Sequence, residues 1–190
     1  MDTKESLRAR LLLQRRLISP DRRQSASLQV CDRLTALSDV QNAHHIAVYI
    51  AIDQEIELAS FIEWCFTEEK TLYAPAYHTA SQAYVLTRLH SMTDVQKGRH
   101  GVSEPPLSDY LIPSNFGQID GFLVPGIGFD RQGYRLGFGK GYYDRLLIEF
   151  SGLKIGIGYE EQIIFACPAD PWDVPMTMVV TEKSVYLPAE

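Results

Sequence analysis

The chain has 190 residues with a formal net charge of −6, and 45 % of its residues are hydrophobic and 11 % aromatic. This composition suffices for one buried core, and because no Pro/Ser/Gly-rich linker divides the chain, we expect a single domain over residues 1–190. No stretch approaches the ~18 consecutive apolar residues of a membrane-spanning helix, which excludes a membrane protein.

The amino-terminal segment predicts two helices. Residues 4–18 have an amphipathic pattern. Charges flank the leucine run at residues 11–13, which is too short for a signal peptide, so we expect a cytoplasmic protein. Residues 19–21, Ser-Pro-Asp, form a helix start, with a capping hydroxyl, a proline at the first helical position and an acid in the first turn. A second helix then runs to about Leu37 and completes an amino-terminal helical pair.

The first 33 residues are basic, in contrast to the rest of the chain. They hold eight of the 18 Lys and Arg residues but only four of the 24 Asp and Glu residues. Such a segment can contact nucleic acid. Its arginines alternate with leucines at helical spacing, however, so we expect a solvated helix face and no nucleic-acid partner.

From residue 45 onward, short apolar runs alternate with helical patterns. Helices are predicted at residues 58–66 and 144–150, and a proline-rich loop at residues 103–117. Continuous apolar strands that alternate with helices indicate an α/β fold, with a mostly parallel sheet flanked by helices. The predicted strands are residues 45–50, 71–75, 83–89, 119–125, 154–159 and 177–181.

A glycine-rich stretch, RLGFGKGYYDR at residues 135–145, follows the predicted strand 119–125. Ligands of such sheets bind beyond the carboxyl ends of the strands, where this stretch lies. Its spacing fits neither a Walker loop nor the dinucleotide-binding fingerprint. Glycine N–H groups and a helix start can still hold an anion, with positive charge from Arg135 and Lys140, and Asp144 can hold a hard cation such as Mg²⁺. We interpret the stretch as a phosphate-binding loop with a metal ligand; the alternative is an irregular strand–helix connection.

The longer segment VPGIGFDRQGYRLGFGKGYYDRLL, residues 124–147, closely resembles the signature of the 5-formyltetrahydrofolate cyclo-ligase family, also called 5,10-methenyltetrahydrofolate synthetase. The resemblance extends over nearly the whole chain. It includes the start of the first helix at residues 4–8, the strand segment VYIAIDQEIE at residues 48–57, and the segment PADPWDVPMTMVVTE at residues 168–182.

The resemblance implies an ATP-dependent ligase that forms a carbon–nitrogen bond. In this family, MgATP phosphorylates the formyl oxygen of 5-formyltetrahydrofolate. The neighbouring folate nitrogen, N10, then closes the ring and expels phosphate, which gives 5,10-methenyltetrahydrofolate, ADP and phosphate. Phosphorylation is needed because an amide-like formyl oxygen is a poor leaving group. The protein has to position two substrates and neutralise charge on the moving phosphoryl group.

The resemblance also assigns candidate site residues. Arg135 and Lys140 are the expected catalytic partners of the phosphates, and Asp144 and Asp173 are the expected Mg²⁺ ligands. The residues expected to contact folate are Ile50, Glu55, Phe138, Gly139, Lys140, Gly141 and Tyr142. The residues expected to contact ATP are Lys4, Glu5, Ser6, Leu7, Arg8, Arg135, Leu136, Gly137, Phe138, Gly139, Lys140, Gly141, Tyr142 and Tyr143.

Chemical arguments support some of these roles, and others have simple structural alternatives. Lys4 and Arg8 are one helical turn apart and face the same way, but without the resemblance they would be interpreted as solvated charges. Glu55 suits a pterin ring, because a carboxylate accepts from adjacent N–H donors. For Asp173 the alternative is a turn before Pro175. The loop aromatics either pack on the folate rings or belong to the core.

Two other functions compete with this interpretation. A non-catalytic nucleotide- or folate-binding protein would keep the loop without turnover, but the presence of all four catalytic and metal candidates argues against it. An RNA-associated role through the arginine-rich helices is disfavoured by the acidic pI of about 5.4 and the lack of aromatic RNA-binding motifs. We expect a monomer whose partners are ATP and 5-formyltetrahydrofolate.

Overall fold

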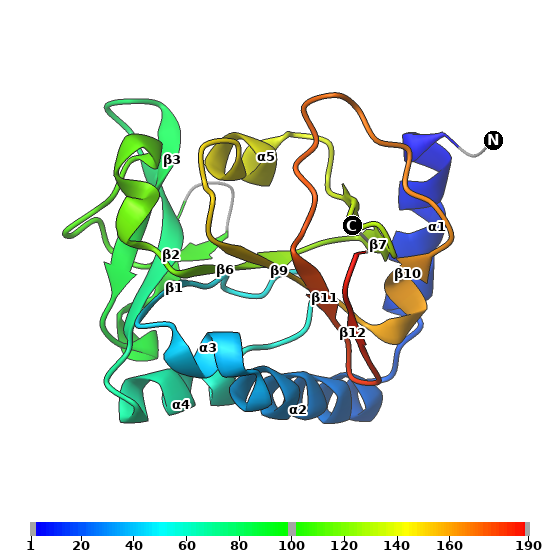
Figure 1. The fold of residues 1–190 in the computed structure, drawn as a ribbon, viewed down its shortest axis with the longest axis horizontal. Helices are drawn as coiled ribbons and strands as arrows, with labels where there is room; N and C mark the ends of the chain where they lie inside the picture. Colours follow the sequence, from blue (N-terminus) through cyan, green and yellow to red (C-terminus); the bar gives the residue numbers. More distant parts are fainter. Residues whose placement is uncertain (1–2, 99–101, 189–190) are drawn as a thin grey trace.

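A seven-stranded sheet forms the centre of the computed structural model, which describes residues 3–98 and 102–188 (Figure 1). The inner strands pair in parallel, and the strand at each edge is antiparallel to its neighbour. In spatial order the strands are β12 (Val185–Tyr186), β11 (Met178–Val180), β9 (Leu153–Ile157), β6 (Gly121–Pro125), β1 (His45–Ala47), β2 (Thr71–His78) and β3 (Ala83–Leu89).

Helices cover both faces of this sheet (Figure 1). On one face lie α2 (Pro20–Ala36), α3 (Ser38–Asn42) and α4 (Ala59–Thr67), and on the other lies α5 (Tyr142–Leu147). The predicted fold class, an α/β fold with a mostly parallel sheet flanked by helices, is therefore confirmed. Within the described part of the chain, no helix is long and apolar enough to cross a membrane.

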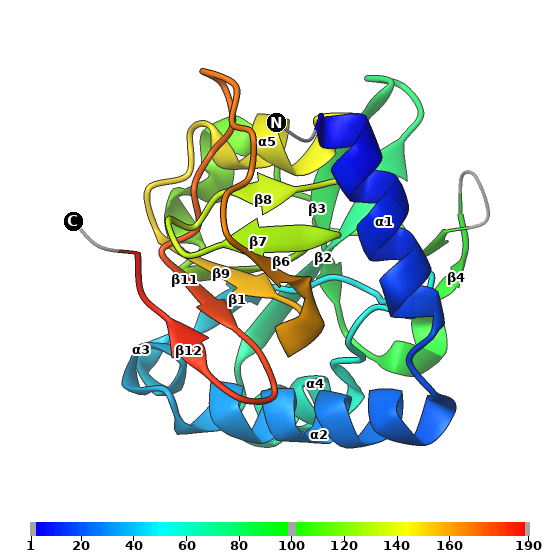
Figure 2. The ribbon, with the colours of Figure 1, turned by 90° about the vertical axis from the view of Figure 1, so that its right-hand side faces the viewer.

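The first helix, α1 (Lys4–Arg16), packs on a second, smaller sheet instead of the central one (Figure 2). Leu7 and Leu11 are buried there in one cluster with Ile127 and Leu136. This packing holds α1 against the segment that leads into the glycine-rich stretch. The small sheet consists of β10 (Ile163–Ile164), β7 (Gly128–Asp130) and β8 (Arg135–Leu136).

Both amino-terminal helices begin with a side-chain cap. The Thr3 hydroxyl accepts a hydrogen bond from the Ser6 N–H at 3.1 Å, and the Ser19 hydroxyl accepts one from the Arg22 N–H at 3.3 Å. Pro20 occupies the first position of α2, where its missing N–H costs nothing. The predicted helical pair is confirmed, although α1 ends two residues earlier than expected.

Several predicted boundaries were wrong. The expected strand 45–50 pairs as a strand only over β1, since the chain then leaves the sheet toward the cavity described below. The helix expected from Asp144 begins at Tyr142. The expected loop 103–117 contains β5 (Ser103–Glu104), which pairs with β4 (Gln96–Lys97), and overlaps a 3₁₀ helix, η3 (Pro113–Gln118). Two further 3₁₀ turns are η1 (Met92–Asp94) and η4 (Glu160–Gln162).

The core is divided by the central sheet into two apolar layers. Leu34 of α2 and Phe61 of α4 are fully buried on one side, and Phe122 of β6 packs with Leu147 of α5 on the other. Burying a side chain of this kind stabilises the fold by about 1.5–3 kcal/mol. The two layers hold rigid the strands whose ends carry the site.

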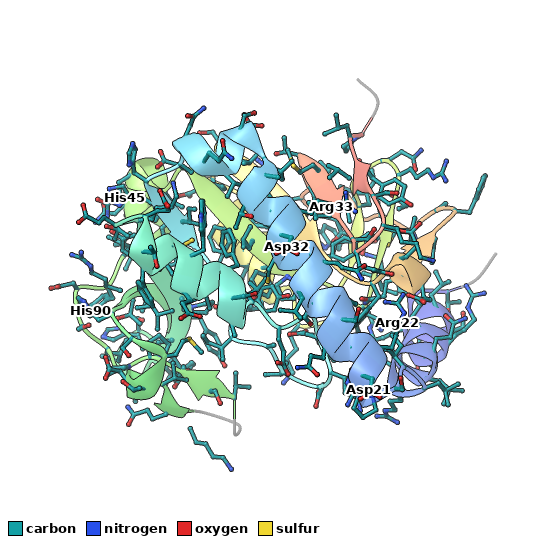
Figure 3. All side chains as sticks on the ribbon, turned by 90° about the horizontal axis from the view of Figure 1, so that it is seen from below. Asp21, Arg22, Asp32, Arg33, His45 and His90 are labelled. Atoms are coloured by element: carbon teal, nitrogen blue, oxygen red, sulfur yellow. The ribbon has the colours of Figure 1, made fainter. Side chains whose placement is uncertain are left out.

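Two arginines of α2 fix the carboxy-terminal segment; both are labelled in Figure 3, which views the face on which α2 lies. Arg22 donates to the carboxylate of Glu182 at 2.5 Å and to that of Glu161 at 3.1 Å. Arg33 donates to the backbone carbonyls of Thr181 and Glu182, both at 3.1 Å. Part of the basic amino-terminal segment thus binds the protein itself instead of forming only a solvated face.

We expect Glu182→Ala to destabilise the protein by about 2–3 kcal/mol, which lowers Tm by roughly 5–10 °C. Glu182 is buried, and its loss leaves the Glu160 N–H without its carboxylate acceptor and leaves Arg22 with only the exposed Glu161 as an acceptor. The matched control is Glu161→Ala, which removes an exposed carboxylate from the same arginine and costs less than about 1 kcal/mol. Thermal unfolding measures the Tm of both variants. Equal decreases in Tm would contradict the stabilising role assigned to the Glu182 carboxylate.

Candidate active site

A cavity of about 840 Å³ opens at the carboxyl ends of β1 and β6, beside Pro75 of the neighbouring strand β2. α1, the segment after β1, the glycine-rich stretch and the chain around residues 170–173 all contribute to its walls. Pockets for small ligands usually measure about 300–1,000 Å³, so the cavity is large. It lies beyond the carboxyl end of β6, where we expected the ligand site, with Pro125 and Gly126 in its wall.

Nearly all of the candidate residues line this cavity. The structure brings together both expected metal ligands, both expected folate contacts of the segment after β1, and the entire stretch from Arg135 to Tyr143. From α1 it brings Lys4 and Arg8. The roles of these residues remain predictions. Their meeting in one cavity is a structural observation: the pairing of Lys4 with Asp170 and Asp173 joins segments more than 160 residues apart in the chain.

Three of the expected ATP-binding residues, Glu5, Ser6 and Leu7, do not line the cavity. Glu5 is exposed, Ser6 donates its N–H to the capping Thr3, and Leu7 is buried against the small sheet. The reason is helical geometry, because residues four apart share a face and those between them point elsewhere. The segment 4–8 therefore presents its first and last side chains to the cavity.

Cationic side chains line one part of the cavity. Lys4 Nζ lies 2.6 Å from a carboxylate oxygen of Asp170 and 2.6 Å from one of Asp173. Partial burial lowers the pKa of Lys4, but the two carboxylates outweigh burial and raise it, so Lys4 is charged. Arg8 donates through Nε to the Gly137 carbonyl at 2.8 Å. That bond ties α1 to the glycine-rich stretch.

The two expected catalytic cations differ in their surroundings. Arg135 is buried and donates to the Asp144 carboxylate at 2.9 Å, and its guanidinium lies over the Tyr143 ring, 5.3 Å from the centroid. Lys140 is exposed at the cavity wall, and its backbone carbonyl accepts a hydrogen bond from Arg145 at 2.9 Å. Arg135 is thus held in one place, whereas the Lys140 ammonium is accessible to a ligand.

Two glycines are required by the geometry around these cations. Gly139 has φ +86°, a backbone conformation that other residues adopt only with strain, and a side chain there would begin 3.2 Å from the Arg8 guanidinium. At Gly126 a Cβ would lie 2.6 Å from the Phe129 ring and 3.0 Å from Arg135 Cγ. Glycine at these positions lets the loop turn and lets Arg135 approach the end of β6.

Glu55 reaches the cavity from a tight turn after β1. Asp53 and Gln54 both have left-handed backbone conformations, with φ of 45° and 66°. Each such residue costs of order 1–3 kcal/mol, so the surrounding structure has to enforce the turn. The Tyr159 hydroxyl donates to the Gln54 carbonyl at 3.1 Å, and the Ile52 N–H donates to the Glu55 carboxylate at 3.1 Å. Strain of this kind is typical of functional sites.

The Glu55 side chain is a buried carboxylate that points into a largely apolar space. Burial raises its pKa to about 7, against the opposing effects of the Ile52 N–H and the positive charge of Arg15. Ile50, the other expected folate contact from this segment, is half-buried and packs against the core. A carboxylate held this way binds strongly to any ligand that offers it N–H donors.

Aromatic rings also line the cavity. Tyr142 packs edge-to-face on Tyr84 with centroids 4.4 Å apart, and on Tyr143 with centroids 4.8 Å apart. Burial raises the pKa of both loop tyrosines, so they stay neutral at physiological pH. The Tyr142 hydroxyl is buried and has no hydrogen-bond partner among the described residues. Phe138 is 44 % exposed at the cavity wall.

Sequence reasoning missed several residues that the fold brings to this site. Asp170 and Trp172 line the cavity beside Asp173, and Arg15 lies 3.9 Å from Glu55. A signal existed for Arg15, because a residue eleven positions after Lys4 returns to the same helix face. No comparable spacing points to Asp170, whose partner Lys4 is distant in sequence.

The expected magnesium ligands lie in the same cavity but do not form a metal centre by themselves. The Asp144 and Asp173 side chains are 19 % and 13 % exposed and pair with Arg135 and Lys4. Over residues 3–98 and 102–188, no three His, Cys, Asp or Glu side chains lie close enough to hold a metal ion. Mg²⁺ prefers oxygen donors and retains waters, so two carboxylates fit it when a ligand supplies further oxygens.

The fold and the cavity define an α/β protein with a cation-lined cavity for small ligands at the carboxyl edge of a parallel sheet. Within that class, the chain belongs to the 5-formyltetrahydrofolate cyclo-ligase family, whose model matches residues 1–182. The sequence-based assignment is thereby confirmed.

Relatives and solved structures agree with this family. The 5-formyltetrahydrofolate cyclo-ligase of Escherichia coli K12 is 30 % identical over 176 residues, covering 90 % of this chain and 96 % of that protein. That of Mus musculus is 30 % identical over 198 residues, covering 95 % and 94 %. The NMR structure of Aquifex aeolicus 5,10-methenyltetrahydrofolate synthetase superposes with a TM-score of 0.85 at 35 % identity, covering 98 % of this chain and 93 % of that one. The family and these neighbours indicate a ligase with cyclo-ligase activity.

Proposed function

We propose that the protein uses ATP to convert 5-formyltetrahydrofolate to 5,10-methenyltetrahydrofolate through a phosphorylated formyl group. The observation that carries this proposal is one cavity that holds two kinds of chemistry. The cations Lys4, Arg8, Arg135 and Lys140 suit a polyphosphate, while the buried carboxylate of Glu55 suits the N–H donors of a pterin. Since both line the same space, two substrates bound there can react with each other.

In the first step the formyl oxygen attacks the γ-phosphorus of ATP, the bond to the bridging oxygen breaks, and ADP leaves. Such transfers need positioning and charge neutralisation more than covalent help from the protein. Arg135 is suited to this task because its buried guanidinium is oriented by Asp144. Lys140 adds an accessible charge, and the bond from Arg8 to Gly137 fixes the loop between them.

In the second step N10 attacks the formyl carbon, its proton goes to solvent, and the carbon–oxygen bond breaks. Phosphate leaves with the former formyl oxygen, and the ring closes. Glu55 binds the pterin and thereby fixes the folate relative to the phosphates. The partly buried ring of Tyr142 packs beside the folate and limits access of water.

Magnesium fits the residues present, and we propose Asp144 and Asp173 as its protein ligands. Bound Mg²⁺ supplies positive charge to the phosphate oxygens and reduces repulsion during transfer. Phosphate oxygens and water would complete its coordination, as is usual for this ion. Asp170 and Asp173 share Lys4 as a partner, so Lys4 would keep the Asp170 carboxylate if Asp173 held the metal.

The test is to mix the purified protein with MgATP and 5-formyltetrahydrofolate, follow methenyltetrahydrofolate absorbance, and quantify ADP and phosphate. We expect equal amounts of methenyl product, ADP and phosphate, and none when ATP or Mg²⁺ is omitted. Binding of both substrates without product would instead support the non-catalytic alternative.

A further inference from the structure

Arg15, in the last turn of α1, is an unusual residue to find in the interior. Its side chain is 2 % exposed, and neither terminal guanidinium nitrogen has a hydrogen-bond partner within the described part of the chain. The nearest carboxylate oxygen belongs to Glu55, at 3.9 Å from Nη1. The guanidinium also lies over the Phe138 ring, 5.9 Å from its centroid, which separates it from solvent.

This arrangement does little for the stability of the fold. Removing an arginine from water is costly, and a buried ion pair repays that cost only with close geometry and additional hydrogen bonds. The Arg15–Glu55 pair has neither, since its separation exceeds a hydrogen bond and the guanidinium nitrogens are unpartnered. An apolar residue would pack there at lower cost. Because the partner is the carboxylate that enters the cavity, the pair points to a role in the site.

We propose that Arg15 is a positioning residue that keeps the Glu55 carboxylate ionised and directed into the cavity, so that it can accept hydrogen bonds from the pterin. Arg15 does not itself line the large cavity; it borders a smaller one of about 130 Å³ that Asp53, Gln54 and Phe138 also line. It therefore acts through Glu55. The inference rests on the proposed function in that Glu55 is taken to bind the folate.

The charges around Glu55 explain why it needs a cation. Its pKa is raised to about 7, chiefly by burial and also by the nearby Asp53 carboxylate, whereas the Ile52 N–H and Arg15 lower it. Tyr49 from the same segment and Tyr143 from α5 also face Glu55, but burial raises the pKa of both phenols, so they carry no charge near pH 7. Without Arg15, a neutral carboxylic acid is favoured at physiological pH.

The ionisation of Glu55 determines how the affinity for 5-formyltetrahydrofolate changes with pH. With a pKa of about 7, Glu55 loses its proton as pH rises through 7, so the protein's affinity for 5-formyltetrahydrofolate increases to a plateau above that pH. Removing Arg15 moves the inflection upward by about one pH unit or more, the usual effect of a cation adjacent to a carboxylate. At pH 7 the ionised fraction then falls from about one half to one tenth or less, and affinity falls about fivefold or more.

The experiment compares Arg15→Gln, Arg15→Lys and the matched control Arg16→Gln, which changes the neighbouring exposed arginine of α1. Calorimetry gives the Kd for 5-formyltetrahydrofolate without ATP between about pH 6 and 9. ¹³C NMR gives the titration of the Glu55 carboxyl in the ligand-free protein. We expect Arg15→Gln to shift both inflections upward, and Arg15→Lys and Arg16→Gln to stay near wild type. Glu55→Gln should bind weakly with a flat pH profile.

The outcomes separate this inference from the proposed function. If the wild type binds the folate but Arg15→Gln leaves both inflections unchanged, Arg15 does not act through Glu55, whatever the turnover. An affinity loss that is equal at every pH also contradicts the inference, since that indicates a structural role. Wild-type protein that does not bind 5-formyltetrahydrofolate contradicts the proposed function instead, while the NMR titration still tests the link between the two residues. If Arg15→Gln does not unfold cooperatively, Arg15→Met replaces it, with the same expected upward shift of both inflections.

Discussion

Arg135→Ala is expected to lower kcat/KM for ATP by about a hundredfold, and Lys140→Ala by about tenfold. Loss of one charge-assisted phosphate contact costs on the order of 1.5–3 kcal/mol, which corresponds to about ten- to a hundredfold. Arg135 should lie at the upper end because it is buried and also pairs with Asp144, whose carboxylate is left without its cation. Lys140 is exposed, so water screens part of its charge.

Steady-state kinetics with ATP varied at saturating folate measures these effects. The Kd for 5-formyltetrahydrofolate, measured separately, should change less than the ATP parameters. Arg131→Ala is the matched control, because Arg131 is an exposed arginine of the same segment that lies outside the cavity, over the Tyr186 ring. ATP kinetics that are the same in both variants as in the wild type would remove Arg135 and Lys140 from the phosphate site.

Asp144→Asn is expected to raise the Mg²⁺ concentration needed for half-maximal activity about tenfold and to lower the maximal rate. The amide retains the shape and one acceptor for Arg135 but loses the charge that attracts the metal. Asp173→Asn should act in the same direction more mildly. Asp173 already shares Lys4 with Asp170, which remains in place to hold that cation.

A Mg²⁺ titration of the initial rate at saturating ATP and folate measures this requirement. Glu149→Gln serves as the control, since it neutralises an exposed carboxylate just beyond α5. If the Asp144→Asn curve superposes on that of the wild type, Asp144 only orients Arg135 and is not a metal ligand. A stronger effect at Asp173 than at Asp144 would reverse the proposed ranking of the two ligands.

The sequence was most informative where the site is built from residues that are close together in the chain. The glycine-rich stretch is contiguous, so its place after β6 and its cations could be predicted. Lys4 and Arg8 were correctly expected to face the same way, because helical spacing fixes that relation. The inner strands of the central sheet were found because burial on both faces makes them continuously apolar.

What could not be predicted depends on contacts between distant segments. The small sheet was missed because β7, β8 and β10 have only two or three residues each, too few to show a pattern, and because β7 and β8 lie among glycines that are typical of loops. The pairing of Lys4 with Asp170 and the approach of Arg15 to Glu55 arise only after α1 docks on that sheet. Helical spacing puts Arg15 on the same face of α1 as Lys4, but no periodicity encodes which distant residue either of them contacts.

The phosphorylated formyl group is the chemical step on which the whole account depends, and oxygen labelling tests it. 5-Formyltetrahydrofolate carrying ¹⁸O in its formyl group is converted by the protein with unlabelled MgATP, and the released phosphate is analysed by mass spectrometry. Because the formyl oxygen leaves bonded to phosphorus, we predict one ¹⁸O atom in each phosphate formed. Methenyl product accompanied by unlabelled phosphate would contradict the account.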